Sequence, residues 1–337
     1  MNIFTQKSEL EGILTELVLL PDDVFSLDKK NAVKTFQNNL QEQRFPVVFA
    51  GRFSTGKSLL LNRLFLEEDL LPSKIQPTTA RTMFIQYGQE KSFYLLKRED
   101  DTEVTKTKVA ATEENIRKYC THMGERKDEY ERFVLEYPLE VLKNGVMFVD
   151  TVGTDDIDDK YVSQTINRIE EAAVVVYVTN ALQPLAQSEI EFLRQHLSET
   201  PKRLFLVANK IDGRSDPSEQ KTIADDLSER FRNFYEQEGI RSEDKVFLVS
   251  AKTGKGLEEF RERIIDFIAN GRVKELITQT SFETKSVLDE EISEIDNILN
   301  QLSLQQQGEE EKLVKQKEEL LELQETLNTK EIEYESL

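Results

Sequence analysis

Short apolar runs, each followed by a helical pattern, fill the middle of the chain. They lie at residues 47–50, 146–149, 174–178, 204–208 and 246–249 and consist mainly of Val, Ile, Leu and Phe. Apolar runs without polar alternation indicate strands buried on both faces, which a parallel sheet covered by helices requires. The pattern therefore predicts an α/β domain whose mostly parallel sheet is sandwiched by helices.

Three more strand-like runs lie between the first and second of these strands, at residues 82–87, 93–96 and 133–137. We expect these runs to extend the sheet. A polar helical stretch at 112–130 precedes the last of them, and the charged run at 97–103 is interpreted as a solvated turn.

Helical periodicity replaces these runs at both ends of the chain. Residues 1–42 place apolar side chains three and four positions apart, with a break at Pro21, which predicts two helices. From Val273 onward the chain has no Pro and one Gly, and the spacing of its Leu and Ile positions is interrupted near that residue, Gly308. This tail predicts a helical hairpin or a contribution to a bundle rather than one uninterrupted coiled coil.

These changes of pattern predict three parts: N-terminal helices at 1–43, an α/β domain at 44–270 and a C-terminal helical or coiled-coil segment at 271–337. We expect the helices at the two ends to form a bundle. The last residues carry no Gly or Pro stop signal, which is the pattern of a helix that continues in a longer parent chain.

Charge and composition narrow the range of partners. Acidic residues outnumber basic ones by 64 to 44, whereas a nucleic-acid groove needs clustered Lys and Arg, so we expect no nucleic-acid partner. The single cysteine, Cys120, cannot form an internal disulfide. No apolar run approaches the ~20 residues of a transmembrane helix. We expect a cytoplasmic protein whose association with a membrane, if it has one, is peripheral.

A phosphate-binding loop is predicted where the first strand meets the helix that follows it. Its glycines allow the backbone to curl so that N–H groups face phosphate oxygens at a helix N-terminus. Lys57 can reach the β- and γ-phosphates of a nucleotide, and the Ser58 hydroxyl can bind Mg²⁺. The residues expected to bind phosphate are Gly51, Arg52, Phe53, Ser54, Thr55, Gly56, Lys57, Ser58 and Leu59.

A second signal, the string DTVG at 150–153, follows the next long strand. At the end of a strand the Asp150 carboxylate can hold a Mg²⁺-bound water, and the Gly153 N–H can contact the γ-phosphate. In the polar segment at 76–81, a threonine could place its hydroxyl on Mg²⁺ and its carbonyl toward the attacking water; we favour Thr79 over Thr78. The expected metal ligands are Ser58, Thr79 and Asp150.

Two further strings indicate guanine. In NKID at 209–212, the Asp212 carboxylate can accept hydrogen bonds from both N1–H and the exocyclic amine of guanine, a pair that adenine does not offer. In SAK at 250–252, a backbone N–H can meet the guanine oxygen. The residues expected to bind the base are Asn209, Lys210, Asp212, Ser250, Ala251 and Lys252. GTP or GDP with Mg²⁺ is therefore the predicted ligand set.

In this order GRFSTGKS, PTT, DTVG, NKID and SAK resemble the GTPase superfamily that includes Era-like proteins and dynamins. The helices ahead of the motifs, the long gap between Thr79 and Asp150 and the helical tail are more similar to bacterial dynamin-like proteins, which are related to mitofusins. Three features depart from the dynamin pattern: Val152 stands where proline is common, NKID replaces TKxD, and SAK is closer to Era.

The resemblance implies a large GTPase that dimerises through its nucleotide-binding faces and remodels membranes, with neck- and stalk-like flanking helices. It also implies that Ser54 positions the catalytic water together with K⁺ or Na⁺, since Thr154 stands where Ras-type GTPases carry a glutamine. The residues assigned to catalysis are Ser54, Lys57, Thr79 and Gly153. Higher oligomers and a peripheral lipid membrane are the further partners it implies.

Three hypotheses remain open from the sequence. The first is a dynamin-like GTPase coupled to membrane remodelling. The second is an Era-like switch in assembly or translation, against which the acidic charge and the lack of a basic RNA-binding tail weigh. The third is an oligomeric scaffold that binds GTP without hydrolysing it. Single-turnover hydrolysis separates the third from the others, and sedimentation with liposomes separates the first two.

Overall fold

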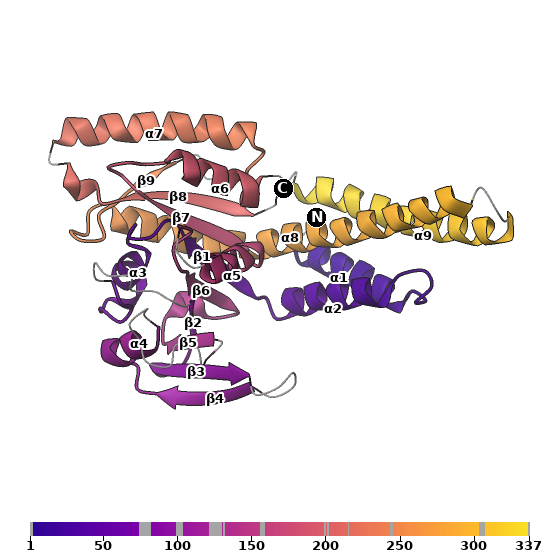
Figure 1. Cartoon of the computed structure of the whole chain (residues 1–337), viewed down its shortest axis with the longest axis horizontal. Helices are drawn as coiled ribbons and strands as arrows, with labels where there is room; N and C mark the ends of the chain where they lie inside the picture. The colour runs from indigo at the N-terminus through magenta and orange to yellow at the C-terminus, as the bar shows by residue number, and fades with distance from the viewer. Residues whose placement is uncertain are drawn as a thin grey trace. The chain divides into compact units, whose positions relative to one another are not determined.

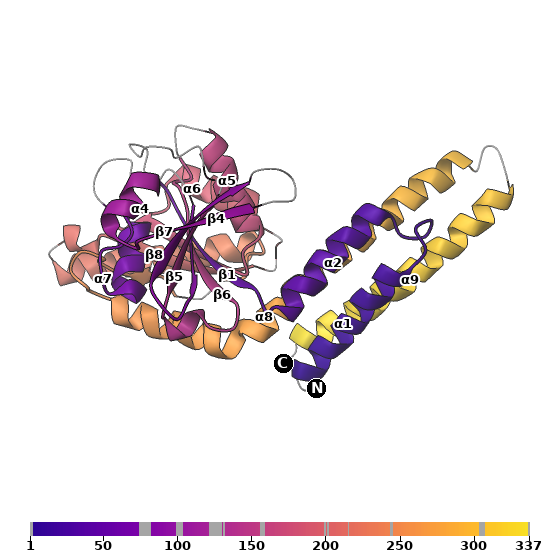
Figure 2. The same cartoon turned by 90° about the horizontal axis from the view of Figure 1, so that it is seen from below.

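The structure, a computed structural model, describes residues 3–73, 82–98, 104–120, 130, 132–155, 159–198, 200, 202–214, 216–242, 245–302 and 307–335. Contacts divide the chain into two compact units. One unit is Phe45–Asn270, and the other combines Met1–Arg44 with Gly271–Leu337. Figures 1 and 2 show the elements of each unit.

Nine strands of the described residues form one mixed sheet in the first unit, in the order β4-β3-β5-β2-β6-β1-β7-β8-β9 (Figure 1). Neighbours from β6 through β9 in this order are all parallel, whereas β2 pairs antiparallel with β6, and β3 pairs antiparallel with β4 and β5. The strands are β1 Phe45–Ala50, β2 Met83–Tyr87, β3 Ser92–Arg98, β4 Val104–Val109, β5 Arg132–Tyr137, β6 Val146–Asp150, β7 Val174–Asn180, β8 Arg203–Asn209 and β9 Phe247–Leu248.

Helices cover both faces of this sheet, which explains why its central strands are continuous apolar runs. On one face Ile169, Leu193 and Leu227, each from a different helix, join strand residues in one buried cluster. On the other face Phe65 packs on Phe148, with ring centroids 4.3 Å apart. The helices are α3 Lys57–Leu61, η1 Asn62–Leu66, α4 Glu113–Cys120, η2 Glu140–Leu142, α5 Asp159–Glu170, α6 Gln187–Leu197, η3 Ile211–Gly213, α7 Pro217–Gln237 and α8 Leu257–Leu302. The predicted α/β class is confirmed.

Four helices make up the second unit within the described residues: α1 Ile3–Leu19, α2 Leu27–Gln41, the part of α8 after Asn270, and α9 Gln307–Glu335 (Figure 2). A hydrogen bond ties α9 to the turn between α1 and α2, where Gln316 donates to the Asp23 carbonyl over 2.7 Å. The fully buried apolar residues of this bundle include Leu10, Leu14, Leu17, Val33, Leu288, Leu320 and Leu327. As expected, α8 and α9 lie side by side as a hairpin. In the part of the chain that the structure describes, no helix combines the length and apolar character needed to cross a bilayer.

One sequence expectation needs correction. Residues 97–98 of the segment interpreted as a solvated turn belong to β3, residues 99–103 lie outside the described part of the chain, and β4 follows as an additional edge strand. The helical pattern expected after the strand at 246–249 is observed as α8, which begins at Leu257 and continues across the boundary between the two units. The predicted helix at 112–130 is observed as α4; residues 121–129 lie outside the described part of the chain.

Candidate nucleotide-binding site

The loop between β1 and α3 curls tightly at the carboxyl edge of the sheet. Gly51 has φ +143°, and a side-chain carbon there would lie 2.2 Å from the Val178 carbonyl oxygen. Gly56 has φ +92°, and a side-chain carbon there would lie 2.6 Å from Asn209 Nδ2. Both positions therefore require glycine, for backbone conformation and for space. This loop is the one that the sequence predicted to bind phosphate.

Lys57 lies at the start of α3 and is 7% exposed. Its ammonium donates to the carbonyl oxygens of Gly51 and Arg52 over 2.8 and 3.1 Å. The positive charge thus lies inside the curve of the loop. There it is placed to meet an anion bound by the loop's N–H groups.

Ser58 and Asp150 come together beside this lysine. The Ser58 hydroxyl donates to Asp150 Oδ2 over 2.6 Å, joining the start of α3 to the end of β6. Asp150 is 2% exposed, and its Oδ1 has no hydrogen-bond partner among the described residues. Burial raises the pKa of Asp150 to about 6, outweighing the hydrogen bond from Ser58 and the charge of Lys57.

This pair of side chains fits Mg²⁺. A buried carboxylate oxygen without a partner is costly in a protein interior. A divalent cation near a hydroxyl and a carboxylate would compensate that oxygen, and hard oxygen donors are the ligands that Mg²⁺ prefers. Ser58 and Asp150 would hold the ion, directly or through water.

The end of β8 builds the opposite side of the site around Asn209. Its amide donates to the Thr55 carbonyl over 2.8 Å, and its Oδ1 accepts from the N–H groups of Lys210 and Ala251, over 2.8 and 2.9 Å. One asparagine therefore fixes the phosphate-binding loop, the NKID turn and the SAK turn relative to one another. Lys210 has φ +70°, a left-handed conformation that this network holds in place.

The Asp212 carboxylate is oriented from the SAK segment. Its Oδ1 accepts a hydrogen bond from the Ser250 hydroxyl over 2.6 Å. That bond fixes the carboxylate in the cavity with its remaining acceptor capacity available for a ligand. A carboxylate held in this way can accept hydrogen bonds from two adjacent N–H donors of a ligand.

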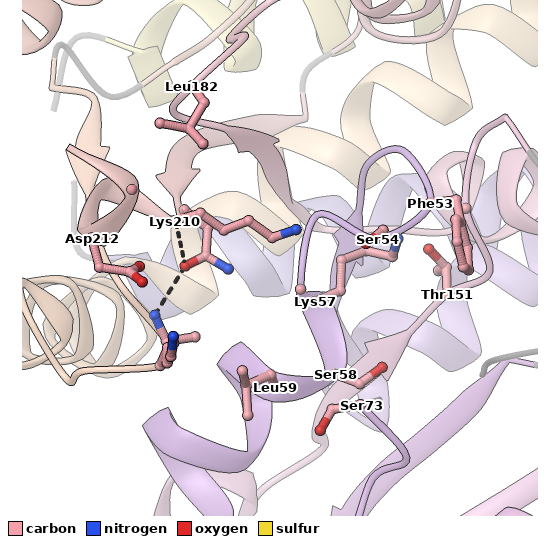
Figure 3. Close-up of a pocket in the computed structure, with 16 residues that line it drawn as sticks. Phe53, Ser54, Lys57, Ser58, Leu59, Ser73, Thr151, Leu182, Lys210 and Asp212 are labelled. Atoms are coloured by element: carbon pink, nitrogen blue, oxygen red, sulfur yellow. Dashed lines mark hydrogen bonds between the residues drawn. The ribbon is translucent and has the colours of Figure 1, made fainter. Parts of the chain in front are cut away.

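These parts line one cavity of about 410 Å³. Figure 3 shows Asp212 and Lys210 at one end, Phe53 and Thr151 at the other, and Lys57 between them. A cavity of this size suits a small-molecule ligand. Its lining residues are Phe53, Ser54, Gly56, Lys57, Ser58, Leu59, Ser73, Thr151, Gly153, Leu182, Asn209, Lys210, Asp212, Gly213, Ala251 and Lys252.

The predicted residues outside this lining have identifiable positions too. Arg52 and Thr55 line a smaller neighbouring cavity of about 220 Å³. Gly51 and Ser250 act through the contacts described above. Thr78 and Thr79 lie outside the described residues, so the choice between them stays a prediction.

Some residues at the site were not predicted from the sequence. Asp155 accepts hydrogen bonds from the Phe53 N–H and from Arg52 Nε, which ties the segment after DTVG to the phosphate-binding loop. Leu182 and Ser73 line the main cavity but belong to no motif. The position of Leu182 just after a buried strand was the one available signal, because strand ends of one parallel sheet gather at a shared edge.

Comparison with known proteins agrees with this architecture. Residues 47–211 match the model of the dynamin family. Dynamin-like protein A of Bacillus subtilis (strain 168) is 26% identical over 196 residues, which cover 58% of this chain and 16% of that protein. The bacterial dynamin-like protein of Nostoc punctiforme is 26% identical over 180 residues, covering 52% of this chain and 26% of that protein.

The fold is shared with a solved structure of an oligomerised bacterial dynamin pair, described as a mechanism for long-range sensing and tethering of membranes. The TM-score is 0.62 at 18% identity, over 88% of this chain and 47% of that one. The chain thus spans less than half the length of each of these relatives. Residues 47–211, which include the phosphate-binding loop and Asp150, are thus similar to the dynamin family, and the chain resembles the bacterial dynamin-like proteins.

Proposed function

We propose that the chain binds GTP with Mg²⁺ and hydrolyses it. The observation that carries this proposal is the single cavity in which Lys57 and Ser58, beside the buried Asp150, lie opposite Asp212. At one end Lys57 and Ser58 supply polar groups that suit phosphates, and at the other Asp212 supplies an acceptor that suits the N–H donors of guanine. An adenine base would leave the Asp212 carboxylate without its two donors.

In the proposed reaction, water attacks the γ-phosphate in line with the leaving oxygen of GDP. Lys57 and the N–H groups of residues 51–58 stabilise negative charge on the phosphates, and the Gly153 N–H contacts the γ-phosphate. Mg²⁺, when bound, neutralises charge on the phosphate oxygens. Ser54 and the backbone of Thr79 orient the water, and K⁺ or Na⁺ beside Ser54 is a further proposed source of positive charge.

We propose that two copies meet through their nucleotide-binding faces and that hydrolysis is coupled to remodelling of a membrane to which the protein binds peripherally. The supports are the match to the dynamin family and the shared fold with a membrane-tethering dynamin pair. Neither the Era-like switch nor the scaffold without hydrolysis is favoured by these similarities.

Release of phosphate tests the catalytic proposal. The purified chain, incubated with Mg²⁺ and either GTP or ATP, should release phosphate from GTP alone, and EDTA should abolish the release. Equal rates with ATP would contradict the assignment of the base pocket. A rate with EDTA equal to that with Mg²⁺ would contradict the metal site.

A further inference from the structure

The loop that joins β7 to α6, residues 181–186, lies at the base end of the main cavity. Leu182 on this loop lines the cavity together with Lys210 and Asp212 (Figure 3). It packs against Gly213 so closely that a side-chain carbon there would lie 2.8 Å from Leu182 Cδ1. Leu182 is nevertheless 38% exposed. A partly exposed apolar side chain beside a base pocket becomes more buried when the ring of a base lies against it, and that burial favours binding.

Hydrogen bonds from buried side chains fix the conformation of this loop. Glu189, in the first turn of α6, is 2% exposed. Its Oε2 accepts from the Ala186 N–H over 2.9 Å and from the Thr179 hydroxyl over 3.1 Å. Thr179 Oγ1 in turn accepts from the Leu185 N–H over 3.2 Å. One carboxylate oxygen therefore organises both ends of the chain segment that carries Leu182.

The loop has a conformation that needs such support. Leu185 has φ +50°, in the left-handed region that side chains other than glycine disfavour. Burial raises the pKa of Glu189, so placing this carboxyl under the loop is itself unfavourable. The strained Leu185 lies in this loop, and the desolvated Glu189 lies next to it. We infer that the conformation of the loop, and with it the position of Leu182, serves the cavity.

The other end of the loop is tied to the base-recognition strand. The Ala181 N–H donates to the Asn209 carbonyl over 2.7 Å, and the Leu182 N–H donates to Asn180 Oδ1 over 3.0 Å. Asn209 is the residue that joins the NKID and SAK turns to the phosphate-binding loop. Leu182 is thereby held in a fixed position relative to Asp212.

We propose that Leu182 contacts the guanine base and that Glu189 is the positioning residue that holds Leu182 there. The inference rests on the proposed nucleotide site and adds to it a determinant of affinity that lies outside all the motifs. By accepting from the Ala186 N–H, Glu189 also satisfies a backbone donor at the start of α6, which alone would make it a residue of helix stability. The positioning role and the helix-capping role predict different GDP affinities when Leu182 and Glu189 are replaced together.

The test is calorimetric titration of GDP with Mg²⁺ into the full chain. Leu182→Ala should raise the Kd for GDP about fivefold, as expected for loss of a partly buried apolar contact. Glu189→Ala should raise it at least as much. Glu189→Gln should stay within about twofold of the original chain, because its amide oxygen can accept the same two hydrogen bonds. Glu191→Ala, which removes an exposed acid from the same helix, is the matched control and should leave the Kd unchanged.

The double variant Leu182→Ala/Glu189→Ala distinguishes positioning from helix capping. If Glu189 acts through Leu182, the double variant should bind GDP no more weakly than Glu189→Ala alone, whereas independent effects would add. Additive losses would overturn the positioning role, as would a loss in Glu189→Gln equal to that in Glu189→Ala. Leu182 is exposed enough for its variant to fold, and an unchanged Kd in Leu182→Ala would overturn the proposal by itself. If the original chain bound no GDP, the proposed function itself would fail.

Discussion

Lys57 is held in position by the phosphate-binding loop itself. Its ammonium bridges two carbonyl oxygens of that loop, and a phosphate would compete for the same charge. We predict that Lys57→Ala lowers GTP affinity or turnover by at least tenfold, because a charge-assisted contact to phosphate is lost. Titration with a fluorescent GTP analogue and phosphate release measure the two effects. Lys221→Ala, which removes an exposed lysine of α7, is the control; near-normal values in folded Lys57→Ala would contradict the site.

Asp212 allows the recognition of the base to be tested by one substitution. With the carboxylate fixed by Ser250, Asp212→Asn replaces one acceptor oxygen by an N–H donor. Guanine then faces a donor where its own amine donates, while xanthine presents a carbonyl at that position. GTP affinity should fall about tenfold or more, and affinity for xanthosine triphosphate should rise. Competition between the two nucleotides measures the change, and an unaltered ratio of affinities would remove Asp212 from the base pocket.

The side chains of the site that could be predicted from the sequence are those that belong to short motifs. Lys57, Asp150 and Asp212 follow strand ends within recognisable motifs, and the structure gathers all three at one edge of the sheet. Leu182 and Asp155 could not be found in that way. Leu182 offers only its place just after a buried strand, and the position of Asp155 depends on a hydrogen bond to a residue 102 positions away, which leaves no local pattern.

At the scale of elements, the helical bundle offers a matched pair of neighbouring leucines. Leu320 of α9 is 0% exposed, whereas Leu321 is 36% exposed. Leu320→Ala should lower the free energy of unfolding of the helical unit by about 2–4 kcal/mol, since it leaves a cavity among buried side chains. Leu321→Ala should cost less than about 1 kcal/mol. Urea unfolding followed by circular dichroism compares the two, and equal losses would contradict the observed face of α9.

Strands that are buried on both faces could be predicted from the sequence, whereas the exposed edge strand β4 could not. In β4, Thr105, Lys106, Thr107 and Lys108 are all exposed, so no apolar run marks the strand. It forms because its backbone pairs with β3, and Lys106 lies over the Tyr94 ring at 3.7 Å from its centroid. Such a contact depends on tertiary structure and cannot be recognised in charged residues alone.

Helix α8 shows that an element can cross the boundary between two parts of a chain. The sequence predicted a helical pattern after the strand at 246–249 and a change of composition near Val273. The helix itself begins at Leu257 because Phe260 and Phe267 pack against Phe205 of β8, at centroid distances of 6.3 and 5.3 Å. One helix thus belongs to two units with different surroundings, and a boundary between units need not coincide with the end of an element.

For the whole molecule, the proposed dimerisation predicts activity that depends on protein concentration. Thr154 stands where a catalytic glutamine would otherwise orient the water, so the loops around Ser54 and Gly153 need another source of order. A second copy meeting the same face would supply it and exclude bulk water. Specific activity should rise with concentration, K⁺ or Na⁺ should increase it, and GDP with aluminium fluoride should promote dimers in light scattering. A specific activity that does not change with concentration, together with a protein that stays monomeric in GDP and aluminium fluoride, would contradict this mechanism. It would leave the proposal of nucleotide binding intact.

The measurement that tests the account most directly is single-turnover cleavage of GTP, with the protein in excess over labelled nucleotide and Mg²⁺ present. The account predicts that the bound GTP is converted completely to GDP, that excess unlabelled GTP blocks the reaction, and that excess ATP does not. Lys57→Ala should leave the label in GTP over the same period. GTP that binds tightly but remains uncleaved at every protein concentration would contradict hydrolysis and favour the scaffold, and cleavage undiminished in Lys57→Ala would contradict the proposed site.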